Sequence, residues 1–384
     1  MGERPQDPTK QILALVREFV RREVTPQAAV HDRDDTYPHR LVEQMKELGL
    51  FGIAVPEEYG GLGLDHTTFA MIFEELSKGW MSVTGVLGTH SVMTYALSNF
   101  GTVEQKRQWL PRLASGEIRG ALAMTEPNTG SDVAAIETVA VRESDEYVVN
   151  GRKLFITNGR HCHSALVMVK TNPDTQPAYQ GISALVVEKG PGFTVGPDMK
   201  KLGYRGVDTC ELIFDNCRVP VENLVGMREG QGFRQVMAAL EAGRINIAAR
   251  AVGVATAAFE AAIAYAQRRE TFGKPIAQHQ AIQIMLADMA TKIHAARLLV
   301  YDAASKKDRG ERCDEEAGMA KLFSSEMCAQ VTLDAMRIHG GYGYIKDLPL
   351  ERYYRDAPLM IIGEGTNEIQ RLIIARSLLR RYAI

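Results

Sequence analysis

Cysteine is scarce in this chain of 384 residues, and the five that occur are scattered along it. No two of them have CxxC spacing, and their number is odd. This pattern argues against a disulfide framework or a zinc site, and it favours a reducing compartment. His161, Cys162 and His163 are adjacent, but neighbours in an extended segment point to opposite faces and rarely bind one metal ion together. A chain of this length can bury a sufficient core without such cross-links.

Excess charge is also lacking, because 45 Lys and Arg residues face 47 Asp and Glu residues, which gives a net charge of -2. This balance argues against a nucleic-acid-binding protein and against a surface that binds anionic lipid. The longest uncharged run lies between Lys78 and Glu104 and contains His90, so it predicts a pair of buried helices and no membrane span. Residues 1–8 have acids and no apolar stretch, which argues against a signal or transit peptide.

The motifs of several enzyme classes are missing as well. The chain has no GxGxxG fingerprint of a Rossmann domain, no GxxxxGK[ST] P-loop, no HExxH zinc motif and no GxSxG elbow. Any function must therefore rest on other patterns.

Hydrophobic periodicity indicates helices in the first third of the chain. Apolar residues from Ile12 to Val24 recur at helical spacing and stop at Pro26. A second helical pattern ends at Gly49, and Thr102 with Gln105 forms a capping-box signature before a third.

Between about Gly120 and Gly226 the apolar runs become short and β-branched. Asn150-Gly151, between two such runs, predicts a hairpin with a type I′ turn over residues 147–157. Further strands are expected at 164–170, 182–188 and 210–214. Several strands with no helix between them indicate an antiparallel sheet or a small barrel.

After Gly232 the pattern turns helical again, with long helices expected at 233–268, 277–306, 315–339 and 367–381. The predicted fold is therefore α+β with three domains. These are an N-terminal α-helical domain (1–118), a middle antiparallel β-barrel or sandwich domain (119–226) and a C-terminal four-helix bundle (227–384).

Four local patterns combine glycine with polar or aromatic side chains, and three of them have both a structural and a functional interpretation. Residues 123–132 (AMTEPNTGSD) supply donors suited to an anion or a cofactor edge, or form a turn with an Asp cap. Residues 155–159 (FITNG) could present a ring to a flat ligand, or simply end a strand. Residues 268–275 (RRETFGKP) end a long helix, and taken alone they have a structural interpretation only. Residues 339–344 (HGGYGY) also end a helix, and their three glycines let a ligand approach the backbone closely.

Glu364 follows an apolar run and precedes Gly365 and Thr366. A carboxylate on an apolar wall can have a raised pKa and act as a base, although the N-terminus of the next helix would favour ionisation. Thr366 can cap that helix, with Glu368 in its first turn. The alternative interpretation is that Glu364 belongs only to the cap.

Taken together and in this order, the motifs resemble those of the acyl-CoA dehydrogenase family of flavoproteins. The resemblance extends from the N-terminal helices through Arg376 and rests on AMTEPNTGSD, KLFITNG, RRETFGKPI with His279-Gln280, HGGYGY, ERYYRD and GEGTNEIQ. The fold that it implies agrees with the three predicted domains.

The resemblance implies a non-covalent FAD between the β-domain and the bundle, completed by a neighbouring subunit. It assigns to FAD the residues Leu122, Ala123, Met124, Thr125, Gly130, Ser131, Phe155, Ile156, Thr157, Arg269, Thr271, Phe272, Gln280, Arg337, Gly340, Gly341, Thr366 and Glu368. It assigns to acyl-CoA the residues Ser131, Glu241, Arg244, Gly365 and Arg376. A homotetramer built as a dimer of dimers, an electron-transfer flavoprotein as electron acceptor, and a cytoplasmic location (or the mitochondrial matrix for a mature eukaryotic chain) are expected on the same ground.

The implied reaction is α,β-dehydrogenation of an acyl-CoA to a trans-2-enoyl-CoA, in which Glu364 takes the α-proton and the β-hydride passes to flavin N5. Two positions depart from the family. Some members carry the base just before the arginine that matches Arg244, where this chain has Gly243, so Glu364 is the sole candidate. The residue before the base is often Tyr and here is Gly363, which predicts a wider acyl pocket that tolerates branched or bulky groups.

Three alternatives stay open at this point. An acyl-CoA oxidase would consume oxygen, although family oxidases are usually longer. A decarboxylating glutaryl-type enzyme is a second alternative. A non-catalytic flavin-binding scaffold is the third, and the retention of Glu364 and Arg244 argues against it.

Overall fold

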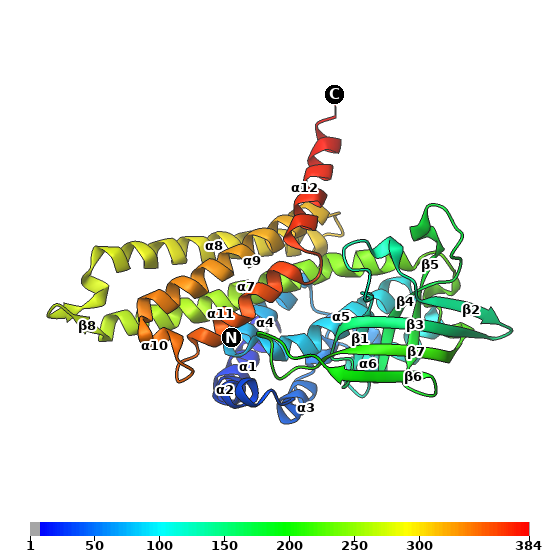
Figure 1. The fold of residues 1–384 in the computed structure, drawn as a ribbon, viewed down its shortest axis with the longest axis horizontal. Helices are drawn as coiled ribbons and strands as arrows, with labels where there is room; N and C mark the ends of the chain where they lie inside the picture. Colours follow the sequence, from blue (N-terminus) through cyan, green and yellow to red (C-terminus); the bar gives the residue numbers. More distant parts are fainter. Residues whose placement is uncertain (1–7, 384) are drawn as a thin grey trace, which may run out of the picture.

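The structure is a computed structural model that describes residues 8–383 (Figure 1). Residues 1–7 lie outside this range. They include most of the segment for which the sequence argued against a signal or transit peptide. A set of N-terminal helices, a curled β-sheet and a C-terminal helical region follow one another along the chain, which confirms the predicted order.

The N-terminal region contains six α-helices among the described residues: α1 (Pro8–Phe19), α2 (Thr25–Asp34), α3 (His39–Glu47), α4 (His66–Gly79), α5 (Met81–Phe100) and α6 (Val103–Ala114). Pro26 does not end the first helix, contrary to the prediction. A π-helical turn over Val20–Val24 precedes it, and Thr25 N–H donates to Val20 O. The wider turn removes the demand for the hydrogen bond that proline cannot make, so the chain continues as α2. The capping box of Thr102 and Gln105 is confirmed at the start of α6.

The uncharged run after Lys78 forms mainly one buried helix, α5, where a helix pair was predicted. A different helix, α7 (Gly232–Arg268), is the one described helix long and apolar enough to cross a membrane by length and composition. The most apolar window of α7 is 72% buried inside the fold, as expected for a core helix.

The middle region is a seven-stranded sheet with the order β1-β4-β2-β3-β7-β6, in which β5 also pairs with β4. Its strands are β1 (Gly120–Ala123), β2 (Val139–Glu143), β3 (Glu146–Thr157), β4 (Ser164–Lys170), β5 (Ile182–Glu188), β6 (Phe193–Asp198) and β7 (Thr209–Pro220). Most pairs are antiparallel, as predicted, but β1 pairs with β4 in parallel. The sheet packs one face on α5 and α6 and curls around a core of its own on the other.

The hairpin predicted at Asn150-Gly151 is wrong. Residues 146–157 form one long strand, β3, with a bulge between Val149 and Gly151. The turn lies earlier, between Glu143 and Glu146, where Ser144 has a left-handed backbone. The glycine at position 151 instead lets β3 lie close to Thr138, because a methyl group at Gly151 would overlap that residue.

The C-terminal region packs α7, α8 (Gln280–Asp308) and α9 (Asp314–His339) side by side, with α4 against α7 and α8. Helix α11 (Leu350–Ile362) completes the packing against α9 and was not predicted, because Pro358 lies inside it. Helix α12 (Asn367–Arg381) packs against the first part of α9, where Ser377 and Arg381 bond to Glu315, and it crosses the bundle at an angle instead of running parallel as a fourth member (Figure 1). At the opposite end of the bundle from the sheet, a hairpin of β8 (Glu270–Thr271) and β9 (Lys274–Pro275) and the short helix α10 (Gly341–Tyr344) connect the long helices.

A buried ion pair joins two of the motifs singled out in the sequence. Lys153 Nζ on β3 donates to Glu126 Oε1 at 2.7 Å, and neither side chain is more than 5% exposed. The same carboxylate accepts from the backbone N–H of Glu137 and of Thr138 at 2.5 and 3.0 Å. Glu126 thereby fixes the loop that follows β1. Burial lowers the pKa of Lys153 to about 8 despite the nearby carboxylate.

Replacing Lys153 with Met is expected to destabilise the fold by about 3–5 kcal/mol, because Glu126 would stay buried without its counter-ion. Urea unfolding measures this free energy. The neighbouring Arg152→Met is the matched control, since Arg152 is exposed and lies 3.6 Å from Glu211. That variant should change stability by about 1 kcal/mol or less, and equal losses in the two variants would contradict the assignment.

Candidate functional site

Glu364 lies in the short connection between α11 and α12, with a left-handed φ of 53°. Its Oε2 atom is buried and has no hydrogen-bond partner among the described residues. Thr366 caps α12 by accepting from Ile369 N–H at 3.4 Å, as predicted. A strained backbone conformation that aims an unpaired carboxylate inward is unusual for a simple helix cap.

A buried lysine holds this connection on both sides of Glu364. Lys321 Nζ on α9 donates to Ile361 O at 2.9 Å and to Asn367 Oδ1 at 2.7 Å. Its side chain is fully buried, and burial lowers the pKa of Lys321 to about 8. No sequence pattern indicates the role of this lysine, since it lies within a long helix among residues of mixed polarity.

Burial raises the pKa of Glu364 to about 7. Three cations act in the opposite direction without cancelling this effect, namely Arg250 and Arg244 on α7 and Lys321 on α9. A carboxyl group with a pKa near neutrality is suited to exchange a proton in either direction.

The Glu364 carboxylate lies against Gly243 on α7, where a methyl group would overlap Oε2. Gly243 also lines a cavity of about 420 Å³ between α5 and α7. Its walls mix apolar and polar side chains, among them Phe69, Val92, Ser91 and Tyr95. The base candidate therefore lies next to a residue of the cavity wall.

The residues predicted to meet acyl-CoA lie in four places. Arg244 and Glu241 are buried on α7, Gly365 lies next to Glu364, and Ser131 and Arg376 are exposed, after β1 and on α12. Arg244 Nε and Nη1 are buried without hydrogen-bond partners, which suits an incoming oxygen. Glu241 is already engaged, because its Oε1 accepts from Lys307 Nζ at 2.5 Å.

Five residues predicted to bind FAD gather around a cavity of about 480 Å³ at the end of the bundle. They are Arg269, Thr271, Arg337, Gly340 and Gly341. Tyr265 and His339, stacked at a centroid distance of 4.3 Å, also line it. Phe272, at the tip of the β8–β9 hairpin, is 96% exposed, and Gln280 at the start of α8 is also exposed. We call the seven predicted FAD residues at this end, namely Arg269, Thr271, Phe272, Gln280, Arg337, Gly340 and Gly341, the bundle-end group.

The other predicted FAD residues belong to the β-domain and to the start of α12. They are Leu122, Ala123, Met124, Thr125, Gly130, Ser131, Phe155, Ile156, Thr157, Thr366 and Glu368. Phe155 is 62% exposed and has a φ of 59°, so a large aromatic ring is presented in a strained conformation. A methyl group at Gly130 would meet no atom within 4 Å. We call the residues from β1 to β3 the sheet group.

The two groups are not brought together within one chain. The sheet lies at one end of the long axis and the β8–β9 hairpin at the other (Figure 1). Helix α7 runs between them, and its 37 residues correspond to about 55 Å.

Some polar residues near Glu364 were missed from the sequence. Arg250, Asn246 and Tyr204 form a hydrogen-bonded cluster that is at most 4% exposed. The sequence does contain one indication of this cluster, because Arg250 is the single charged residue among the mostly small and apolar residues 245–253 of α7.

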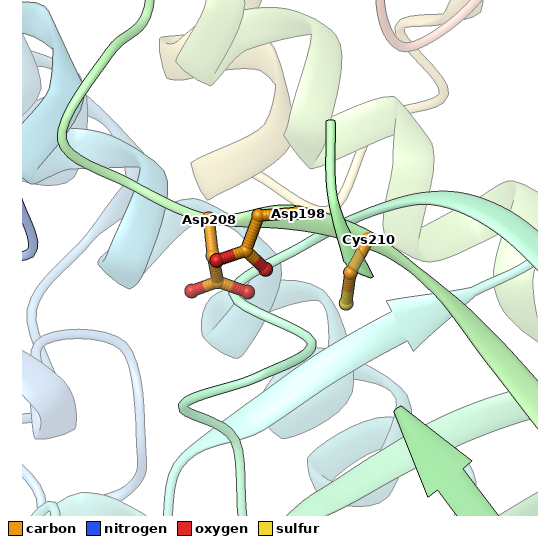
Figure 2. Close-up of side chains that lie close together, drawn as sticks. All are labelled: Asp198, Asp208 and Cys210. Carbon is orange, nitrogen blue, oxygen red and sulfur yellow. The ribbon is translucent and has the colours of Figure 1, made fainter. Parts of the chain in front are cut away.

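A cluster of possible metal ligands, formed by Asp198, Asp208 and Cys210, lies at the β6–β7 end of the sheet (Figure 2). Both carboxylates already have partners: Asp198 accepts from Arg160 Nε at 2.8 Å, and Asp208 accepts from Arg160 N–H at 2.7 Å. His161 Nδ1 lies 2.7 Å from Asp208 Oδ1. Burial raises the pKa of Cys210 to about 12, which keeps the thiol protonated. These contacts account for the cluster as part of the fold.

Three family models match the chain in succession. They are the acyl-CoA dehydrogenase N-terminal domain over residues 6–117, the middle domain over 121–217 and the C-terminal domain over 230–379. An acyl-CoA dehydrogenase of Bacillus subtilis (strain 168) is 48% identical over 367 residues, which cover 95% of this chain and 96% of that protein.

Solved structures agree with these matches. Butyryl-CoA dehydrogenase from Megasphaera elsdenii superposes with a TM-score of 0.95 at 38% identity, covering 99% of this chain and 100% of that one. A chain in the structure described as the electron transferring flavoprotein of Acidaminococcus fermentans gives a TM-score of 0.94 at 42% identity, with coverage of 99% and 100%. The chain therefore belongs to the acyl-CoA dehydrogenase family, whose members are FAD-dependent oxidoreductases.

Proposed function

We propose that this chain dehydrogenates an acyl-CoA thioester between the α and β carbons, with Glu364 as the base that takes the α-proton. The observation that carries the proposal is the Glu364 carboxylate, whose Oε2 atom is buried and unpaired and lies against Gly243, a residue that lines the α5–α7 cavity. Because burial raises its pKa to about 7, Glu364 binds a proton more readily than a carboxylate in water would.

The residues present fit FAD. The bundle-end group offers the cations Arg269 and Arg337 at an open cavity, which suits a pyrophosphate, and the sheet group offers an exposed aromatic ring beside an open glycine turn. When bound, FAD supplies the two-electron acceptor that the reaction requires. The protein's part is to orient the thioester, exclude water and accept the proton at Glu364.

The two groups lie at opposite ends of one chain, so we propose that each FAD site combines the sheet group of one subunit with the bundle-end group of another. The 96% exposed Phe272 supports this, because a large aromatic side chain is seldom left in water without a partner. A tetramer built as a dimer of dimers would contain such sites, and the domain boundaries near residues 119 and 227 would place each site between domains.

The substrate carrier is proposed to be CoA, with Arg244 and Ser131 meeting it and Glu241 positioned by Lys307. Gly363 leaves the pocket without the ring that many relatives place before the base, which supports tolerance of branched or bulky acyl groups. An electron-transfer flavoprotein is the proposed electron acceptor, supported by the structural match to a chain solved in that context.

Anaerobic bleaching of the bound flavin across a panel of acyl-CoAs tests this function. We expect bleaching by at least one saturated acyl-CoA, with branched chains reacting as fast as linear ones. Strict preference for a short linear chain would contradict the wide pocket. Oxygen consumption faster than dye or flavoprotein reduction would identify an oxidase, and the absence of bleaching by any acyl-CoA would identify a scaffold.

Gly243→Ala is expected to lower kcat by about 10- to 100-fold, because the new methyl group displaces the Glu364 carboxylate from its place beside α7. Thermal stability should hold or rise slightly, since alanine favours a helix over glycine by about 1 kcal/mol. Gly318→Ala on α9 is the matched control, because its methyl group would meet Ile374 at an ordinary 3.4 Å. Unchanged kcat in Gly243→Ala would contradict the placement of the base.

A further inference from the structure

A buried guanidinium lies near the proposed base, and beyond its effect on the pKa of Glu364 the proposed reaction gives it no role. Arg250 on α7 is 3% exposed and makes no ion pair with any carboxylate in the described part of the chain. Its Nε donates to Asn246 Oδ1 at 2.6 Å, and its Nη1 donates to the Tyr204 hydroxyl at 3.1 Å. The guanidinium lies over the Phe73 ring at 5.5 Å and attracts Glu364 electrostatically, but it has no anion in direct contact. Because a buried charge without a contacting counter-ion is costly, this arrangement suits an anionic partner.

The neighbours of Arg250 leave only donors free. Asn246 is 1% exposed, its carbonyl oxygen is occupied by Arg250, and its Nδ2 is buried without a partner. The Tyr204 oxygen accepts from Arg250, so its own proton remains available to donate. No residue within 8–383 is seen to accept from Arg250 Nη2. A cluster with three free donors and one positive charge is complementary to a carboxylate, which has two acceptor oxygens and one negative charge.

Two glycines on α5 make room for this cluster. A methyl group at Gly85 would overlap the Tyr204 hydroxyl, and one at Gly88 would overlap Arg250 Nη2 and lie 3.1 Å from Asn246 Nδ2. Tyr204 is itself held in a left-handed conformation, with φ 55°, and its N–H donates to Asp356 Oδ1 at 2.6 Å. Elements distant in sequence thus converge to place the donors.

The cluster lies at a suitable distance from the base. Gly243, which contacts the Glu364 carboxylate, and Arg250 are seven residues apart on α7, so they share a face about 10 Å apart along the axis. Ser91, which lines the cavity, donates to Gly88 O at 2.7 Å, so the cluster lies one turn from that cavity on α5. A short acyl chain with its α-carbon at Glu364 could therefore reach Arg250 with its far end.

We propose that Arg250, aided by Tyr204 and Asn246, binds a carboxylate at the distal end of the acyl group. The substrate class is then a short dicarboxylic acyl-CoA, in which the second carboxylate is free. This inference rests on the proposed dehydrogenation and adds to it the residue that selects the substrate.

The test compares acyl-CoAs that differ only in a terminal methyl or carboxylate, namely pentanoyl-CoA with glutaryl-CoA and butyryl-CoA with succinyl-CoA. Anaerobic flavin reduction by the FAD-loaded enzyme should favour the carboxylate member of at least one pair by about 100-fold in kcat/KM. Arg250→Gln should bring the ratio of the two kcat/KM values to about one. The ratio is the readout because loss of this cation also raises the pKa of Glu364 and so affects both members alike. Arg250→Lys, which keeps the charge, should restore part of the preference, and Arg234→Gln, an exposed arginine of α7, should have no effect.

Preference of the unmodified enzyme for the methyl member of both pairs would overturn the proposal, and this comparison needs no variant. Equal losses for both members in Arg250→Gln would overturn it as well, because they would show that Arg250 acts through Glu364. If Arg250→Gln does not fold, Tyr204→Phe supplies the comparison, because it removes one of the three donors and should weaken the preference. An unchanged preference in Tyr204→Phe would then count against the proposal. Bleaching by the methyl members alone refutes only this inference, whereas bleaching by no acyl-CoA refutes the proposed function too.

Discussion

Glu364→Gln is expected to slow flavin bleaching by an acyl-CoA by about 1,000-fold while FAD stays bound. Glutamine has the same shape but cannot accept the α-proton, and among the described carboxylates that of Glu364 lies nearest to the Gly243 position. The flavin absorbance measures both the bleaching rate and the FAD content. Glu260→Gln, on an exposed glutamate of α7, is the control and should behave as the unmodified enzyme. Bleaching at the normal rate in Glu364→Gln would refute the mechanism.

The same carboxylate should set the pH dependence of the reaction. The base acts when ionised, and burial raises the pKa of Glu364 to about 7 against the influence of Arg250, Lys321 and Arg244. The value of kcat/KM should therefore rise with pH, by about tenfold per unit below pH 7, and level off above it. A profile that is flat between pH 5 and about 8 would show that another group takes the proton.

Long periodic segments could be predicted from the sequence because burial alone determines their pattern. Strands β4 and β5 and the bundle helices α7, α8 and α9 lie close to the expected ranges. Local turn chemistry was a poorer guide. Asn150-Gly151 has the composition of a hairpin turn, but tertiary packing decides its conformation, since Thr138 comes too close for any side chain at Gly151. Pro26 was likewise predicted to end a helix, but the π-helical turn before it lets the helical path continue into α2.

The candidate site also contains residues that the sequence predicts and residues that it does not. Glu364 could be predicted from the sequence, because it follows an apolar run and also belongs to the motif GEGTNEIQ. Arg250, Tyr204 and Asn246 could not, since they come from α7 and from the segment after β6, and only the folded chain shows that their remaining hydrogen-bond donors converge. Lys321 and Lys153 were missed for a related reason, because a lysine in an amphipathic pattern is ordinarily exposed.

The division of the FAD residues between two ends of the chain leads to a complementation experiment. Gly130→Glu places a carboxylate in the open turn of the sheet group, and Arg269→Glu reverses an exposed cation of the bundle-end group. Each variant alone is expected to fold and to lose nearly all FAD and activity, because a negative charge would face an anionic cofactor.

Coexpression of the two variants should recover about one quarter of the normal FAD content and activity. If subunits pair at random, about half of the dimers are mixed, and one of the two sites in each mixed dimer contains neither substitution. Arg269→Glu coexpressed with Arg337→Glu is the control, since both changes lie in the bundle-end group and every site would carry one of them. FAD bound within a single chain predicts no recovery in either mixture, so equal and negligible activity in both would refute the shared site.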